Sequence, residues 1–296
     1  MKLKKTSYTI SVAGTASERL SGRKMVLLAD FHNGDPGPVL AMLYEDMPDV
    51  ILIPGDVVLG YLPEGNNLIL NRCRNIIPFL EGCAGIAPTY VSVGNHECLL
   101  CNEDLDALKA TGITLLDNEW TEITFRDEQR AVHLAEDRIL AGGLTSAHTM
   151  SYRRFRDQYN RDHEGEYVRY PYRRRPRDIA KYPSESAWLD EYEKEEGYRI
   201  LLCHHPEYWC IREPMLKDRD LDLVLSGHAH GGQWQFFGRG IYAPGQGILP
   251  RYTCGMHYGP YGRMIISRGL NNPYRSVPRW GNPCEIVYCV FGDTEA

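Results

Sequence analysis

The chain has 296 residues, of which 43% are hydrophobic and 24% are charged, as in a folded globular protein rather than a disordered or fibrous one. Its 33 basic and 39 acidic side chains give a net charge of −6, so no overall positive field attracts nucleic acid or an anionic membrane, and any such contact has to be local. One large core at this length needs no disulfide bonds, and we expect a single domain over residues 1–296.

The N-terminal segment and the cysteine content predict a cytoplasmic protein. Lys2, Lys4 and Lys5 are not followed by the apolar stretch of a signal peptide, and no later run approaches the length of a membrane span. The nine cysteines are an odd number, and we expect them to be reduced thiols. Cys98 and Cys101 form an isolated C-x-x-C pair, which we interpret as two buried small side chains rather than half of a zinc site.

Short apolar runs that end abruptly in polar residues predict strands buried on both faces. In chain order these runs cover residues 25–29, 50–53, 89–93, 200–203 and 221–225. The early runs alternate with segments of helical spacing, as in an α/β sheet, at residues 39–47, 68–80 and 103–110. Later, glycine-punctuated stretches predict a second sheet with hairpins, at residues 234–237, 264–267 and 285–291. Gly142 and Gly143 are expected to lie in a turn.

Residues 151–177 differ in composition from the rest of the chain. They hold nine arginines and five tyrosines without a sustained apolar period, which predicts a surface insertion. One interpretation is a basic lid that makes a peripheral contact with an anionic substrate or lipid headgroup, because arginine binds phosphate in a bidentate manner. The other, which is commoner for charge runs, is a solvated face whose arginines pair with nearby acidic residues.

Residues of types that bind metals follow each of the five apolar runs named first. In chain order they are Asp30, His32, Asp56, Asn95, His96, His204, His205, His228 and His230. Any one of them alone has an ordinary explanation as a turn, loop or hydrogen-bonded residue. Because the carboxyl ends of parallel strands share one edge of a sheet, we expect all of them to meet in a single site.

The donor types indicate an open catalytic metal site. Carboxylates and imidazoles without cysteine suit divalent first-row metals rather than a closed structural zinc site. There are more donors than one ion can use, which predicts two ions joined by a carboxylate. Asp56 is the natural bridge, because Gly55 before it lets the backbone turn tightly.

Two pairs of donors are separated by one residue each. If the backbone stays extended, Asp30 and His32 point to the same side and Phe31 faces away. The same holds for His228 and His230 on either side of Ala229. This spacing predicts two clamps that hold a metal.

The ordered set D-x-H, G-D, G-N-H-E, a strand-end His and G-H-x-H, which runs from Asp30 to His230, resembles the signature of the calcineurin-like metallophosphoesterase superfamily. The continuation through residues 227–233, 267–270 and 278–285 resembles the bacterial YkuE-type branch of phosphodiesterase-like proteins. The resemblance implies a four-layer α-β-β-α sandwich, in which helices cover two facing mixed β-sheets and a dinuclear metal site lies at the C-terminal ends of the strands.

The resemblance also implies a role for each residue of the site. One ion is expected to bind Asp30, His32, Asp56 and His230. The other is expected to bind Asp56, Asn95, His204 and His228. His96 is implied as the group that assists at the phosphoryl centre. A shift of one residue would exchange His204 for His205, although the position of Cys203 at the strand end favours His204.

These observations together predict a metal-dependent phosphohydrolase. A metal-bridging hydroxide would attack a phosphodiester, monoester or pyrophosphate, with His96 as general acid. The two divalent ions would be Mn, Fe, Zn or Co. The expected partner is a phosphorylated small molecule or a lipid-like phosphoester, since the net charge provides no groove for nucleic acid. The alternative is a non-catalytic metal-binding scaffold on the same fold, but all eight positions of the expected site are filled, which favours the enzyme.

Overall fold

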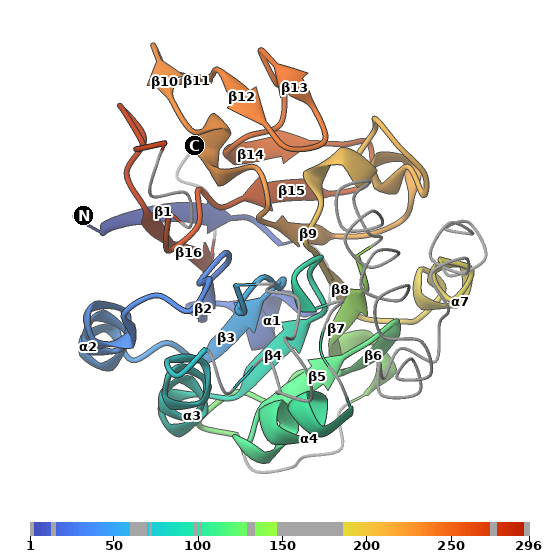
Figure 1. The fold of residues 1–296 in the computed structure, drawn as a ribbon. Helices are drawn as coiled ribbons and strands as arrows, with labels where there is room; N and C mark the ends of the chain where they lie inside the picture. The colour runs from blue at the N-terminus through green and yellow to red at the C-terminus, as the bar shows by residue number, and fades with distance from the viewer. Residues whose placement is uncertain are drawn as a thin grey trace, which may run out of the picture.

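The computed structural model describes residues 3–12, 16–59, 70, 73–97, 100, 102–128, 134–146, 186–272 and 277–292. Within these residues, two six-stranded mixed sheets lie face to face (Figure 1). The predicted insertion at residues 151–177 lies outside the described residues, and so do Cys98 and Cys101. The expectation of a single domain over residues 1–296 stays a prediction.

The first sheet has the strand order β1-β16-β2-β3-β4-β5. Its central strands are uniformly buried, which agrees with the apolar runs of the sequence. β2, β3, β4 and β5 run parallel, β16 is antiparallel to β2, and β1 is parallel to β16. The bounds are β1 Lys4–Ile10, β16 Glu285–Phe291, β2 Lys24–Leu27, β3 Val50–Ile53, β4 Thr89–Ser92 and β5 Thr114–Leu116.

The second sheet has the order β14-β15-β9-β8-β7-β6. β15, β9, β8 and β7 run parallel, and the two edge strands are antiparallel to their neighbours. The bounds are β14 Gly255–Tyr258, β15 Arg263–Ile266, β9 Leu223–Ser226, β8 Tyr198–Cys203, β7 Ile139–Leu144 and β6 Glu119–Glu122. Two small hairpins precede β14 in the chain, formed by β10 Gln235–Phe236 with β11 Arg239–Gly240 and by β12 Tyr242–Ala243 with β13 Gly247–Ile248.

Helices cover the outer faces of the two sheets. The first sheet is covered by α2 Pro36–Asp46, α3 Ile76–Ile86 and α4 Asn102–Ala110. Apolar side chains of these helices and of the sheet form one hydrophobic core. On the second sheet the described helices are short, namely α7 Leu189–Tyr192 and the 3₁₀ segments η5 Pro206–Tyr208 and η6 Leu216–Asp218. The remaining short helices are α1 Ala16–Leu20, η3 Ala135–Asp137 and η7 His230–Gly232. The expected four-layer arrangement is therefore confirmed, with a thinner outer layer on the second sheet.

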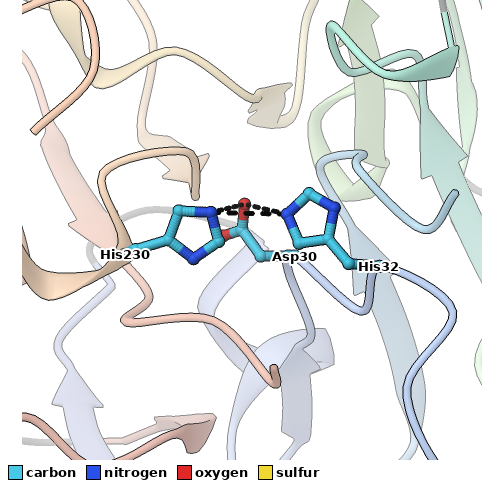
Figure 2. A group of neighbouring side chains, drawn as sticks. All are labelled: Asp30, His32 and His230. Atoms are coloured by element: carbon cyan, nitrogen blue, oxygen red, sulfur yellow. Dashed lines mark hydrogen bonds and ion pairs between the residues drawn. The ribbon is translucent and has the colours of Figure 1, made fainter. Parts of the chain in front are cut away.

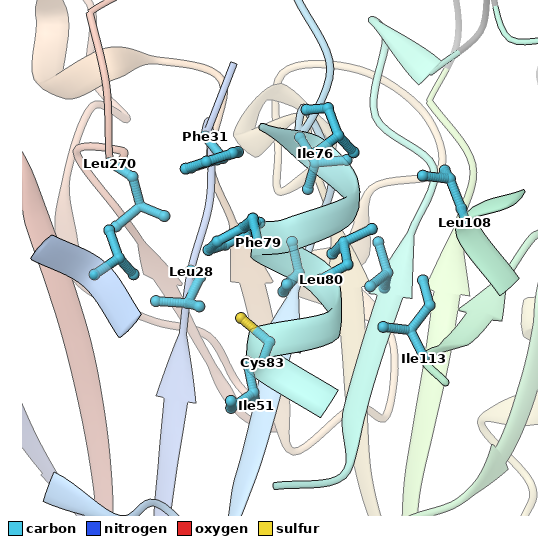
Figure 3. Packing of buried hydrophobic residues seen from close by; sticks show 14 of the residues in the cluster. Leu28, Phe31, Ile51, Ile76, Phe79, Leu80, Cys83, Leu108, Ile113 and Leu270 are labelled. Atoms are coloured by element: carbon cyan, nitrogen blue, oxygen red, sulfur yellow. The ribbon is translucent and has the colours of Figure 1, made fainter. Parts of the chain in front are cut away.

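The core between the first sheet and its helices anchors the loop that follows β2. The rings of Phe31 and Phe79 are stacked with their centroids 3.8 Å apart, and Figure 3 shows Phe31 facing α3 beside Leu270. Burial of each such side chain contributes about 1.5–3 kcal/mol. Packing therefore fixes Phe31, and with it the position of its two neighbours, Asp30 and His32.

Several elements differ from their predicted positions. The helix expected at residues 68–80 begins at Ile76 and runs to Ile86, and Pro78 is tolerated in its first turn because the amide there needs no partner. Gly142 and Gly143 lie within β7 and not in a turn. The last strand, β16, joins the first sheet rather than a second sheet of late strands. β1 was not predicted, because its alternating exposure gives no uniform apolar run.

Candidate active site

Tight turns at the ends of the strands place the predicted donors. Asp30, His32, Asp56, His228 and His230 all have positive φ, between 44° and 65°. The expectation that both donor pairs lie on extended backbone is therefore wrong. Their side chains converge because the chain turns sharply at each donor, a conformation that costs about 1–2 kcal/mol for a residue with a Cβ and that clusters at functional sites.

The first group of donors joins the two sheets. Asp30 and His32 follow β2, whereas His230 follows β9. The Nε2 atoms of His32 and His230 lie 3.3 Å apart, and each is 3.6 Å from Asp30 Oδ1, as Figure 2 shows. Ligand atoms bound at 2.0–2.1 Å to one tetrahedral ion lie about 3.3–3.4 Å apart. The three atoms therefore have the spacing that a single metal ion requires.

The second group contains Asp56, His204 and His228. Oδ2 of Asp56 lies 3.0 Å from His204 Nε2 and 3.9 Å from His32 Nε2, so this oxygen lies between the two groups. His228 Nε2 and Asn95 Oδ1 are buried without a hydrogen-bond partner among the described residues. Buried polar atoms are ordinarily paired, and these atom types bind first-row metals. The residues therefore fit the expected metal.

The protonation of the imidazoles follows from their surroundings. Burial and the charge of the neighbouring His204 lower the pKa of His228 to about 3. Burial also lowers the pKa of His230 well below its usual value. Both rings are thus neutral and carry a lone pair that can bind a cation. Burial also lowers the pKa of His204, but Asp56 and Asp30 outweigh it and raise that pKa to about 9. His204, together with His96 and His32, holds the pKa of Asp56 well below its usual range against the effect of burial.

His204 and His205 have different surroundings. His204 approaches Asp56, whereas Nδ1 of His205 lies 2.9 Å from Ser146 Oγ, and its ring lies over His228 with centroids 4.1 Å apart. Cys203 is the last residue of β8, as the sequence indicated. This geometry favours His204 as the donor and leaves His205 to support His228.

His96 is the least buried of the predicted site residues. Its Nε2 is 3.6 Å from Asp56 Oδ2, and its side chain is 14% exposed, in contrast to the fully buried ring of His32. His96 also completes a possible metal group with His32 and Asp56. Of the other histidines, His133, His148 and His163 lie outside the described residues, and His257 is half-buried with Nε2 3.2 Å from the Cys254 carbonyl oxygen.

Glu97 is an important residue to which the sequence analysis gave no role. Its buried carboxylate accepts hydrogen bonds from the backbone N–H groups of Asp56, Val57, Val58 and Gly94, at 2.7–3.0 Å. It thereby ties the turn after β3 to the turn after β4. Its place beside His96 in the G-N-H-E sequence was the available signal, but only the fold shows that four amides converge on it.

Arg279 was also left without a role in the site. Its Nη2 donates to Nδ1 of His230 at 2.9 Å and to the Asn271 carbonyl at 2.6 Å. Nearby, Arg268 forms an ion pair with the buried Glu285 at 2.5 Å. Arg279 therefore holds a donor of the first group in place, while Arg268, after β15 of the second sheet, pairs with Glu285 at the start of β16 in the first sheet.

Comparison with known proteins agrees with this geometry. A zebrafish (Danio rerio) transmembrane protein with metallophosphoesterase domain is 27% identical over 224 residues, which are 73% of this chain and 42% of that protein. The chain thus spans less than half the length of this relative. Phosphodiesterase YaeI of Escherichia coli is 24% identical over 265 residues, which are 85% of this chain and 76% of that protein.

A solved structure of a dimetal phosphatase from Danio rerio overlaps 86% of this chain and 90% of its own, with a TM-score of 0.40 and 10% identity. The family model for the calcineurin-like phosphoesterases matches residues 23–232. This range is more than half of the chain and contains every predicted site residue. The chain therefore belongs to the calcineurin-like phosphoesterase family.

Proposed function

We propose that this protein is a metal-dependent phosphoric ester hydrolase with two divalent ions. The observation that carries the proposal is the convergence of carboxylate and imidazole donors from both sheets at the C-terminal ends of their strands. Asp30, His32, Asp56 and His230 would hold one ion. Asp56, Asn95, His204 and His228 would hold the other. When bound, two such ions neutralise charge on the phosphoryl oxygens and lower the pKa of a water toward about 7, so that it can act as nucleophile.

The protein's own residues would orient the substrate and move the proton. His96 is the predicted site residue whose side chain is partly exposed, and we assign it the protonation of the leaving oxygen. General acid catalysis of this kind contributes about 10²–10⁴ in rate. Arg279 and Glu97 would hold His230 and Asp56 in place through the contacts described above.

Hydrolysis of bis-p-nitrophenyl phosphate in the presence of Mn²⁺ tests the proposal. We expect turnover by the native protein and none by Asp30→Asn, which removes the negative charge of a donor of the first group. Asp46→Asn is a matched control, because Asp46 pairs with Lys5 on the surface. If no divalent metal among Mn, Fe, Zn and Co supports turnover, the protein is a metal-binding scaffold. Parallel assays with a monoester and a pyrophosphate determine the class of ester.

The role of His96 gives a separate prediction. We expect His96→Ala to lower kcat by about 10²–10⁴ while metal analysis still finds both ions. Loss of an ion in this variant would instead identify His96 as a ligand in the group with His32 and Asp56. His257→Ala is the control, since His257 bonds only to a backbone carbonyl among the contacts described.

The place of the reaction in the cell is also a proposal. Seven cysteines of the described residues are free thiols, five of them buried, which supports a reducing compartment such as the cytoplasm. In the part of the chain that the structure describes, no helix has the length and apolar character needed to cross a bilayer. The narrower resemblance to the YkuE-type branch stays a prediction.

A further inference from the structure

A fully exposed phenylalanine lies at the tip of the β10–β11 hairpin. The strands are joined by the two-residue loop Phe237-Gly238, in which both residues have positive φ (50° and 76°). Such loops favour asparagine or glycine at the first position, and a bulky side chain there is strained. Phe237 nevertheless occupies it with a relative exposure of 106%. The turn itself gives no reason for a large apolar residue at this position.

Phe237 belongs to a larger exposed surface, which we call the aromatic rim. Its members are all more than a third exposed and come from two segments, and they are Trp234, Phe236, Phe237, Val277 and Trp280. The rings of Phe236 and Trp280 lie 4.5 Å apart, and Trp234 forms a β-bridge with Trp280. The neighbouring β12–β13 hairpin exposes Tyr242, Ile248 and Leu249, and both hairpins project at the same end of the molecule (Figure 1).

The aromatic rim is connected directly to the candidate active site. Trp280 follows Arg279, whose guanidinium donates to His230. Asn282 Nδ2 donates to the carbonyl oxygens of both His230 and Gln233, at 2.7 and 3.1 Å. Trp234 is the next residue after Gln233. Residues that hold His230 in place are therefore sequence neighbours of the rim.

The segment of the sequence that carries the rim differs in charge from the whole chain. Residues 231–284 contain six arginines and no lysine, aspartate or glutamate, in a chain whose net charge is −6. Arg239 lies opposite Phe236 in the hairpin and is exposed, and Arg251 is exposed next to Tyr252. Among the described residues neither arginine forms an ion pair with an acidic side chain. The rim is thus apolar and aromatic, with the unneutralised charge of Arg239 directly beside Phe236.

We propose that the aromatic rim docks on an anionic lipid surface and presents the active site to phosphoesters held there. Tryptophan, tyrosine and phenylalanine side chains favour the interface between headgroups and acyl chains, and arginines are attracted to anionic headgroups. Exposed aromatic side chains together with an exposed arginine, in a segment of the sequence without acidic residues, match this surface. Docking does not depend on the proposed hydrolysis, whereas the presentation of substrate rests on it.

Co-sedimentation of the full chain with vesicles tests the docking. We expect binding to phosphatidylcholine vesicles that contain phosphatidylglycerol, weaker binding to phosphatidylcholine alone, and a decrease with added salt. Phe237→Ser removes one exposed ring and should lower the partition coefficient about tenfold. Arg239→Gln should lower it less and reduce the effect of salt. Tyr44→Ser is the matched control, because Tyr44 is an exposed aromatic residue on α2 and should leave binding unchanged.

Activity measurements separate docking from catalysis. Phe237→Ser should hydrolyse soluble bis-p-nitrophenyl phosphate at the native rate and lose activity only on a phosphodiester embedded in anionic vesicles. Absence of vesicle binding by the native chain would overturn docking even if the soluble ester is cleaved. Vesicle binding without any hydrolysis would contradict the proposed function and leave docking in place. If Phe237→Ser instead converts a dimer to a monomer in sedimentation velocity, the rim is an interface between two copies and the proposal is wrong.

Discussion

At the scale of single residues, the site depends on side chains held on strained backbone. Asp30 and Asp56 each end a parallel-strand segment with φ near 55°, and the surrounding contacts must offset that strain. The Asp30 carboxylate accepts hydrogen bonds from the backbone N–H of His228 at 3.1–3.2 Å. The Asp56 carboxylate accepts one from the backbone N–H of His96 at 2.9 Å. Backbone amides that follow other strands, β9 for Asp30 and β4 for Asp56, therefore orient both carboxylates.

Glu97 provides the first prediction at this scale. Glu97→Gln replaces an acceptor oxygen with an amino group that faces backbone N–H groups, and leaving buried donors unpaired costs about 1–3 kcal/mol each. We expect a lower free energy of unfolding and a metal affinity reduced about 10- to 100-fold. Urea unfolding and metal titration measure the two effects.

Glu128→Gln is the control for Glu97→Gln. Glu128 accepts hydrogen bonds from Arg19 and from the N–H of Phe125, so the variant should lose stability without a change in metal affinity. A Glu97→Gln variant that binds metal as tightly as the native chain would show that the four amides hold their positions without the carboxylate.

The strained tip of the β10–β11 hairpin provides the second prediction. Phe237→Gly relieves the positive φ of an exposed residue, and we expect the free energy of unfolding to rise by up to about 1 kcal/mol. Tyr44→Gly, on a helix, should lower it by about the same amount. Thermal unfolding measures both. A decrease for Phe237→Gly would mean that the ring stabilises the hairpin through its neighbours rather than straining it.

At the scale of elements, β7 shows why glycine is needed inside a strand. A Cβ atom on Gly143 would lie 2.4 Å from Leu116 Cβ and 2.7 Å from the Leu116 carbonyl oxygen, at the end of β5. On Gly142 it would meet the ring of Tyr192 at 3.0 Å. The two glycines let β5 of the first sheet and α7 approach β7 closely.

A matched pair of variants tests this interpretation of β7. Gly143→Ala should lower the free energy of unfolding by about 1–3 kcal/mol, since backbone must move. Gly142→Ala should cost less, because an aromatic ring at its contact distance can shift. Urea unfolding of the two variants measures the difference. Equal costs, or a larger cost for Gly142→Ala, would contradict the close approach of β5 and β7.

At the scale of the whole molecule, the donors connect the two sheets. Asp30, His32, Asp56 and Asn95 follow strands of the first sheet, whereas His204, His228 and His230 follow strands of the second. An ion bound by both sets holds the sheets together at one end, while the apolar core between them holds the rest. Metal binding should therefore stabilise the molecule as one unit.

Removal of metal tests this connection. At a free Mn²⁺ concentration 100 times its dissociation constant, binding stabilises the native state by about 2.7 kcal/mol, and we expect a chelator to remove that increment from the free energy of unfolding. Asp56→Asn should no longer respond to the chelator. Asp46→Asn should respond as the native chain does. A native chain whose unfolding midpoint is the same with Mn²⁺ and with chelator would contradict the link between the sheets.

The sequence by itself determined the local features. Buried strands such as 50–53 are uniformly apolar, because both faces are covered, and the donors at their ends are of metal-binding types, so both could be recognised from residue identity alone. The resemblance to the family added the order of layers. The parallel arrangement that the pattern indicated accounts for Asp30 and Asp56 at one edge of the first sheet, whereas His230 follows a strand of the second sheet.

Only the tertiary structure decided how the donors are aimed and supported. The positive φ of His32 and His228 depends on contacts with residues far away in the chain, and no local pattern encodes it. The convergence of four amides on Glu97, the packing of Arg279 against His230 and the exposure of Phe237 are likewise long-range properties. They arise when strands distant in sequence are brought to one edge, and the chain's local preferences do not specify that arrangement.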